Sequence, residues 1–172
     1  EISVNSTSSD QIVSVQRLSS SQSGFIALDD VDNVKPSNAP NDNHFAVIIG
    51  NENYTSKNVK NVAFAERDAQ VFKLYCTNLL GVPEDNVELL TNGSFVQMTE
   101  AINSVSRRAK QRDKPVVYFY YAGHGWPTPH TQEPLLVPAD IGPNQLRSAI
   151  KINEIIAALT LINPHRCLRC VN

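Results

Sequence analysis

The sequence predicts an α/β fold, a mostly parallel sheet with helices on both faces. Short apolar runs alternate along the chain with longer segments whose apolar residues recur every three or four positions. The runs are rich in β-branched and aromatic residues, which favour strands, and the longer segments have the spacing of amphipathic helices. Such alternation is typical of βαβ units, whose right-handed crossovers place helices on both faces of one sheet.

Three apolar runs are predicted to be strands of this sheet. They span residues 44–50, 87–90 and 116–121. The first and the third are apolar or aromatic almost throughout, which is expected of strands that are covered on both faces. Residues 134–138 are expected to form a further short strand.

Helices are predicted after the first two strands and near the end of the chain. The first spans residues 61–80 and is followed by Gly81 and Pro83, which end a helix. Ser94 and Gln97 have the spacing of a capping box at the start of the second. The three apolar stripes are Val62, Ala65, Ala69, Phe72, Cys76 and Leu79, then Phe95, Met98, Ile102, Val105 and Ala109, then Ile152, Ile155, Ile156 and Leu159.

Composition divides the chain of 172 residues into two parts and excludes some function classes. Residues 1–43 are rich in Ser, Asn and Asp and predict a flexible tail or linker, so the folded domain is expected over 44–172. The net charge of −2 predicts no bulk attraction to nucleic acid or to an anionic membrane. No apolar run approaches the roughly 20 residues of a membrane span. We expect a soluble protein, and its compartment, bacterial cytoplasm or outside, stays open.

The third predicted strand runs directly into Gly123-His124-Gly125. In parallel α/β sheets, ligands and chemistry collect at the carboxyl ends of the strands. The glycines let the backbone turn sharply and let a substrate approach, and the Gly125 N–H is placed to donate to a developing oxyanion. A histidine in such a loop is also common as a purely structural residue, so its position alone leaves both interpretations open.

Four motifs occur in order along the chain: HFAVIIGNENY, a helix with AERDA, then VVYFYYAGHG and LLVPAD. Together they resemble the caspase-like cysteine peptidases, which include caspases, metacaspases and bacterial relatives. The resemblance covers about residues 44–164 and is closest to the bacterial, metacaspase-like side. It implies a caspase-like three-layer α/β sandwich, in agreement with the strand and helix pattern, and cysteine-type endopeptidase activity.

The resemblance also implies roles for individual residues. His124 matches the histidine of a Cys-His dyad, in which a thiolate attacks the scissile carbonyl and the histidine handles protons. The Gly125 amide matches the oxyanion donor. Asp68 matches a buried acid that lines the pocket for the residue before the cut, which implies peptide or protein substrates with Arg or Lys there. Its alternative is a surface carboxylate that caps the helix or pairs with Arg67 or Lys60.

We also form expectations for two other acids, for cofactors and for the oligomeric state. Glu66 is expected to be an ordinary surface residue. Asp140 matches a recurrent loop acid of the family, with turn formation as the alternative. No metal site or cofactor is evident; calcium activates some metacaspases, but the relevant loops are not evident in this sequence. The oligomeric state stays open.

The expected nucleophile segment is the main departure from the family. The family carries an Asp-x-Cys-x-Gly-like segment on the strand after the last helix, whereas this chain continues as LINPHRCLRCVN. We therefore expect the sequence to stop before the nucleophile, which would fall at or just beyond Asn172. The chain then holds the histidine half of the site and is inactive alone. Cys170 and, less so, Cys167 are alternative nucleophiles, although their neighbours differ from the family's.

The cysteines have other interpretations as well. Cys167, Cys170 and His165 resemble half of a zinc site, although no second pair of ligands stands nearby. The two cysteines could also form a disulfide in an oxidising compartment or be free thiols. Cys76 falls on the apolar stripe of the first predicted helix and is expected in the core.

Two further function classes stand beside the peptidase. One is a non-catalytic caspase-like module that binds or regulates a partner, which the missing nucleophile favours. The other is a generic doubly wound domain with a small ligand at its strand ends, but no Gly-x-Gly-x-x-Gly or phosphate loop supports it.

Overall fold

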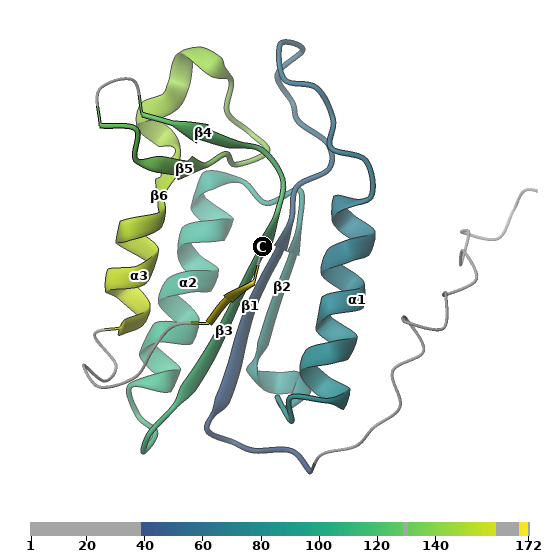
Figure 1. Cartoon of the computed structure of the whole chain (residues 1–172), viewed down its shortest axis with the longest axis vertical. Coiled ribbons are helices and arrows are strands. Elements are labelled where there is room, and N and C mark those ends of the chain that lie inside the picture. Colours follow the sequence, from purple (N-terminus) through teal and green to yellow (C-terminus); the bar gives the residue numbers. More distant parts are fainter. Residues whose placement is uncertain (1–38, 129–130, 161–168, 172) are drawn as a thin grey trace, which may run out of the picture.

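The computed structural model describes residues 39–128, 131–160 and 169–171. Its centre is a sheet in the order β2-β1-β3-β7, in which all neighbouring strands are parallel (Figure 1). These strands are β1 (His44–Gly50), β2 (Val87–Thr91), β3 (Val116–Ala122) and β7 (Arg169–Val171). The prediction of a mostly parallel sheet is therefore confirmed. The short strand β7 was not predicted, because its residues form no apolar run.

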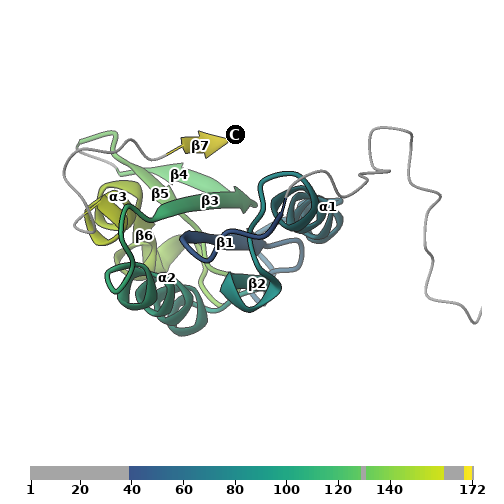
Figure 2. The ribbon, with the colours of Figure 1, turned by 90° about the horizontal axis from the view of Figure 1, so that it is seen from below.

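Helices cover both faces of this sheet, as predicted. Helix α1 (Ala65–Asn78) lies on one face, and α2 (Phe95–Ala109) and α3 (Ile152–Thr160) lie on the other (Figure 2). The side chains of β1 alternate between the two cores. Those of Phe45, Val47 and Ile49 pack with α2 and α3, and those of Ala46 and Ile48 pack with α1. This alternation explains why β1 reads as a continuous apolar run.

The helix boundaries follow local signals. The predicted capping box at the start of α2 is confirmed, since Ser94 Oγ accepts from the Gln97 N–H and Gln97 Oε1 accepts from the Ser94 N–H. Helix α1 begins four residues later than predicted, because the backbone of Phe64 is left-handed. Phe95 was predicted in the core but is 36% exposed, because it is the first residue of α2 and precedes the buried stripe.

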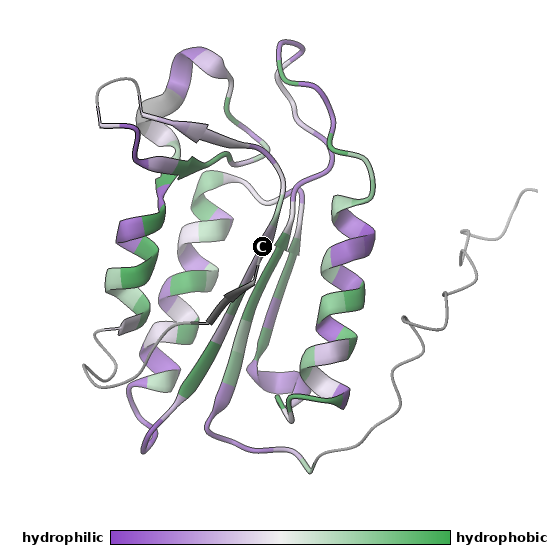
Figure 3. Cartoon of the chain, viewed as in Figure 1, coloured by the Kyte–Doolittle hydropathy of each residue, from purple (hydrophilic) through white to green (hydrophobic). Residues whose placement is uncertain are grey.

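Strand β3 is less buried than its apolar sequence predicted. Of its seven residues only Phe119 is fully buried, whereas β1 is buried from Phe45 to Gly50. Phe119 belongs to the core shared with α2 and α3, whereas Tyr118 and Tyr120, on the opposite face, are only partly buried where they pack against the core under α1. Figure 3 shows the hydrophobic residues concentrated in the middle of the strands and on the sheet-facing sides of the helices.

A small antiparallel sheet follows β3 at the carboxyl edge of the main sheet (Figure 1). Its strands are β4 (Gly125–Pro127), β5 (Pro134–Leu136) and β6 (Ile150–Lys151). The short strand expected at 134–138 is confirmed over 134–136, while β4 and β6 are too short to give a sequence pattern. The short 3₁₀ helices are η2 (Glu84–Asn86) and η3 (Pro143–Ser148). Within the described ranges, none of the helices has the length and hydrophobicity that crossing a membrane requires.

Candidate active site

His124 lies at the carboxyl edge of the parallel sheet, two residues after β3 ends at Ala122. Its side chain is half-buried. The Nε2 atom is 2.7 Å from the carbonyl oxygen of Lys60. Because a carbonyl oxygen only accepts, Nε2 carries the hydrogen of this bond. The other ring nitrogen, Nδ1, is therefore the one at which the neutral imidazole accepts a proton.

Tyr54 contacts the same histidine from the loop between β1 and α1. The backbone N–H of His124 donates to Tyr54 Oη at 2.8 Å, and the two rings lie 5.0 Å apart between centroids. Lys60 belongs to this loop as well. The loop over residues 51–64 thus fixes both the backbone and the ring of His124.

The Tyr121 side chain contacts the backbone of the Gly123–Gly125 turn. Its hydroxyl lies 2.9 Å from the carbonyl oxygens of both His124 and Val137, and its one hydrogen serves one of them at a time. Burial, and then the neighbouring Tyr54, raise the pKa of Tyr121, so its hydroxyl stays a donor.

The two positions that flank His124, Gly123 and Gly125, differ in whether they could hold a residue with a side chain. A Cβ at Gly123, whose φ is 157°, would lie 2.6 Å from Tyr121 Oη and 2.9 Å from Tyr54 Oη. A Cβ at Gly125 would meet only Leu135 O, at 3.6 Å, which is an ordinary contact. Local packing therefore requires glycine at position 123 and tolerates a methyl group at position 125.

The Gly125 N–H points away from the small sheet. The N–H of Val137 donates to His124 O at 3.0 Å, which makes Gly125 and Leu136 a non-hydrogen-bonded pair in the antiparallel ladder. In such a pair both backbone polar groups point away from the partner strand. Gly125 is also exposed, so this donor lies on the accessible side of β4.

Asn51 joins the ends of three strands beneath the site and was not singled out from the sequence. Its side chain is fully buried; Nδ2 donates to Val137 O at 3.0 Å, and Oδ1 accepts from the Gly93 N–H at 2.8 Å. Its backbone N–H donates to Ala122 O at 2.8 Å. The available signal was a polar amide directly after an apolar strand, where a buried polar group needs partners.

Glu66 was expected to be an ordinary surface residue, and this was wrong. The side chain is half-buried, and Oε1 accepts from Asn53 Nδ2 at 2.9 Å and from Asn92 Nδ2 at 2.7 Å. Asn92 Oδ1 in turn accepts from the N–H groups of Glu52 and Asn53. Because α1 begins at the carboxyl edge of the sheet, its first turn meets the loops after β1 and β2, and Glu66 connects them.

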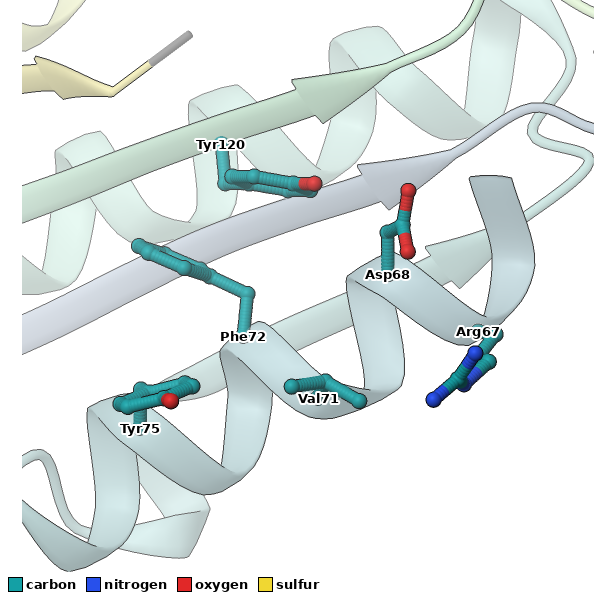
Figure 4. Close-up of a pocket in the computed structure, with 6 residues that line it drawn as sticks. All are labelled: Arg67, Asp68, Val71, Phe72, Tyr75 and Tyr120. Carbon is teal, nitrogen blue, oxygen red and sulfur yellow. The ribbon is translucent and has the colours of Figure 1, made fainter. Parts of the chain in front are cut away.

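Asp68 is exposed on the side of α1 that borders β3, in contrast to the expected buried acid. Ala65, three residues earlier, is buried, and Phe72, four residues later, packs against the core under α1, so position 68 lies at the edge of the sheet-facing side of the helix. In Figure 4 the carboxylate is directed toward the hydroxyl end of Tyr120. Burial and then the Asp68 charge raise the pKa of Tyr120.

A hollow of about 270 Å³ lies beside Asp68 between α1 and β3 (Figure 4). Phe72 and Tyr120 stack across it, with ring centroids 4.4 Å apart and an interplanar angle of 16°. Its lining residues are Arg67, Asp68, Val71, Phe72, Tyr75 and Tyr120. The hollow therefore offers one carboxylate and one guanidinium beside a mainly aromatic surface.

The comparison with protein families decides what kind of domain carries this site. The model of the caspase domain, a peptidase family, matches residues 43–167, more than half of the chain. This chain belongs to the caspase domain family. The predicted resemblance is thereby confirmed, and membership places the chain in a family of cysteine peptidases. No curated protein matched the sequence.

Asp140 of the caspase domain holds the start of α2. Its Oδ1 accepts from the Phe95 N–H at 2.9 Å, beside the capping box formed by Ser94. A carboxylate at this position satisfies a free N–H of the first helical turn and suits the positive end of the helix dipole. In this structure Asp140 thus joins the loop after β5 to α2.

Strand β7 brings the backbone of Cys170 opposite Phe119 of β3 in the caspase domain. Phe119 is three residues before the end of β3, so Cys170 lies about 10 Å before the edge at which His124 follows. Cys167 and His165 lie outside the described residues, as does Asn172, so the zinc, disulfide and nucleophile interpretations that involve them are untested.

Cys76 is a core thiol, as predicted. It is fully buried in α1, and burial raises its pKa to about 12. The described residues contain no group of three or more His, Cys, Asp or Glu side chains that could hold a metal ion.

Proposed function

We propose that this caspase domain carries the histidine half of a cysteine-type endopeptidase, with His124 as the dyad histidine. The supporting observation is the bond from His124 Nε2 to the Lys60 carbonyl at 2.7 Å. It fixes the tautomer and leaves Nδ1 as the proton acceptor, while Tyr54 orients the ring. An oriented imidazole at a sheet edge is what activation of a thiol requires.

The thiol partner is proposed to follow β7. Because β7 runs parallel to β3, its carboxyl end is directed toward the edge where His124 lies. The backbone of Cys170 pairs with Phe119, about 10 Å short of the end of β3, so a residue later in the chain suits this edge better. This distance supports a nucleophile after β7 over Cys170.

The reaction then has two halves. His124 Nδ1 takes the thiol proton, the thiolate adds to the scissile carbonyl, and the Gly125 N–H donates to the oxyanion. The C–N bond breaks as the imidazolium gives its proton to the leaving amine, and a thioester remains. His124 next takes a proton from water, the hydroxide adds to the thioester, and the thiolate leaves as the carboxylic acid product forms.

Asp68 is proposed to bind the basic side chain before the cut, Arg or Lys. Its carboxylate is exposed at the start of α1, the end of the helix nearest the edge that carries His124. A carboxylate that borders an aromatic hollow suits a cation, because ring faces attract positive charge.

The experiment begins with the sequence encoded after position 172. The proposal expects an Asp-x-Cys segment within the next roughly 20 residues, the reach of one strand and its loop. A protein that includes this segment should hydrolyse Arg- and Lys-ended reporter peptides, and His124→Ala should abolish that activity. Absence of such a segment would refute the proposed endopeptidase activity. Equal rates on Asp-ended peptides would refute the proposed specificity for Arg and Lys.

A non-catalytic binding module is the second candidate function. It is favoured by the absence of an Asp-x-Cys pattern from the 172 residues and by the position of Cys170. In that case peptides would bind at Asp68 and remain uncleaved in every form of the protein.

A further inference from the structure

The side chain of Asn61 joins the two arms of the loop that holds His124. Asn61 Nδ2 donates to Asn53 Oδ1 at 2.8 Å, and Asn61 Oδ1 accepts from the Tyr54 N–H at 3.4 Å. Beside this pair, the N–H of Val62 donates to the carbonyl oxygen of Glu52 at 2.9 Å. The loop over residues 51–64 is therefore folded back on itself at Asn61.

Both contacts that hold His124 begin next to this side chain. Lys60, whose carbonyl lies 2.7 Å from His124 Nε2, directly precedes Asn61 in the chain. The peptide group between Lys60 and Asn61 is planar, so the direction of that carbonyl changes when the backbone of Asn61 turns. Tyr54, whose hydroxyl accepts from the His124 N–H, is the residue whose own N–H donates to Asn61.

Glu66 anchors the two amides to α1. Its Oε1 accepts from Asn53 Nδ2 at 2.9 Å, so hydrogen bonds lead from the first turn of α1 through Asn53 to Asn61. The helix itself is held against the sheet by buried residues such as Ala65. Asn53 and Asn61 are exposed and add little to the core, so their loss should affect mainly the position of the loop.

We propose that Asn61 is a positioning residue for His124 that acts through the Lys60 carbonyl, with Glu66 as its anchor. The catalytic meaning of this inference rests on the proposed role of His124 in the dyad. With Asn61 in place the carbonyl faces Nε2, which keeps the hydrogen there and leaves Nδ1 bare. Without Asn61 the carbonyl turns more freely, and the tautomer with its hydrogen on Nδ1 becomes more populated.

The ring of His124 in the 172-residue chain tests the positioning without any catalysis. The chain is labelled with ¹⁵N, and the shifts of the two ring nitrogens at alkaline pH give the populations of the neutral tautomers. His124→Gln identifies the signals by their loss. Asn61→Ala should raise the population of the Nδ1–H tautomer about fivefold, the change that loss of one ordinary hydrogen bond produces. An unchanged population would overturn the proposal.

Variants of Glu66 test the anchor. Glu66→Gln keeps an acceptor for Asn53 and should retain the native tautomer ratio, whereas Glu66→Ala should shift the ratio in the same direction as Asn61→Ala. Equal shifts in the two variants would overturn the role of Glu66. Asn153→Ala is the matched control, because it breaks an exposed bond of the same kind, from Asn153 Nδ2 to Glu133 Oε1 at 2.9 Å. A shifted ratio in this control would overturn the specific role of Asn61.

Urea unfolding separates positioning from loss of the fold. Because Asn61 is exposed, Asn61→Ala should unfold at nearly the native urea concentration. Asn53→Ala removes the partner of the Asn61 amide and is the second variant if Asn61→Ala does not fold. It should shift the tautomer ratio in the same direction, and a native ratio would overturn the proposal.

The outcomes also distinguish this inference from the proposed function. If the native ring carries its hydrogen on Nδ1, the contact with Lys60 and the proposed proton acceptor are wrong, and the positioning role fails with them. If the native ring is in the Nε2–H form and Asn61→Ala leaves the ratio unchanged, only the positioning by Asn61 is wrong, and the proposed role of His124 stands.

Discussion

The Nε2 atom of His124 lies 2.7 Å from the carbonyl oxygen of Lys60, and the two residues are 64 positions apart in the sequence. This bond ties the end of β3 to the loop before α1. A second contact, from the His124 N–H to Tyr54 Oη, ties the same turn to the same loop. The imidazole is thus oriented by two contacts from one loop, which the proposed proton transfer requires.

Tyr54→Phe should lower stability and alter the environment of the His124 backbone. The substitution removes the acceptor of the His124 N–H and keeps the ring contact, so we expect a loss of about 1 kcal/mol in unfolding free energy and a changed His124 amide shift. Urea unfolding and ¹H–¹⁵N spectra measure the two effects. Tyr120→Phe removes a phenol from the outer part of β3 and is the control. Equal shifts of His124 in both variants would refute the specific role of Tyr54.

Gly123→Ala and Gly125→Ala should differ sharply in stability. The first methyl group would lie 2.6 Å from Tyr121 Oη and is expected to cost about 2–3 kcal/mol. The second would meet Leu135 O at 3.6 Å and should change stability by less than about 0.5 kcal/mol. Thermal or urea unfolding gives both values. Equal destabilisation would show that the tyrosine hydroxyls do not set the requirement for glycine.

Asn51→Ala should be the most damaging polar substitution near the site. It leaves the buried Gly93 N–H without its acceptor and removes one of the two donors that face Val137 O, the other being the Tyr121 hydroxyl, which costs about 2–3 kcal/mol. Asn53→Ala, at an exposed neighbour that bonds Glu66, should cost less than about 1 kcal/mol. Unfolding curves of the two variants test this order, and the reverse order would contradict the role given to Asn51.

Cys76 should be unreactive in the folded protein. Burial raises its pKa from 9.0 to about 12, so at pH 8 the native thiol is protonated as well as inaccessible. A thiol reagent is applied to the chain with Cys167→Ser and Cys170→Ser, so that only Cys76 can react. Labelling should follow the unfolded fraction as urea increases. Rapid labelling without urea would contradict the core position.

The same shift predicts the direction of a pH effect on stability. Between about 9 and 12 the native state keeps the Cys76 proton, whereas the unfolded chain loses it. Since the native state then binds more protons, the contribution of this group to stability falls as pH rises through that window. Cys76→Ala should reduce the slope of unfolding free energy against pH above 9.

The fold could be predicted because its strands and helices carry strong periodicity. β1 is apolar on both sides and α2 has a capping box, and both appear where the sequence places them. The contacts of Glu66 and Asn51 could not be predicted, because they depend on which loops meet at the carboxyl edge. The same is true of Asp68: helical periodicity placed it beside the core residue Ala65 without showing that its carboxylate is exposed beside Tyr120.

His124 was predicted from its position after a strand, but the Lys60 carbonyl and the Tyr54 hydroxyl were not. A backbone carbonyl carries no sequence signal, and Tyr54 lies in a loop without periodicity. The left-handed backbone of Phe64 was missed as well, since a left-handed residue that is not glycine contradicts the usual preference. Local rules thus found the elements, while the contacts between loops came only from the structure.

The tautomer of His124 tests the central claim most directly. Long-range ¹H–¹⁵N correlation spectra of the 172-residue chain at alkaline pH, where an imidazole is neutral, report which ring nitrogen carries the hydrogen. The account predicts the Nε2–H form with a bare Nδ1, and Tyr54→Phe should loosen but not reverse it. A neutral ring with its hydrogen on Nδ1 would contradict the bond to Lys60 and remove the proposed proton acceptor.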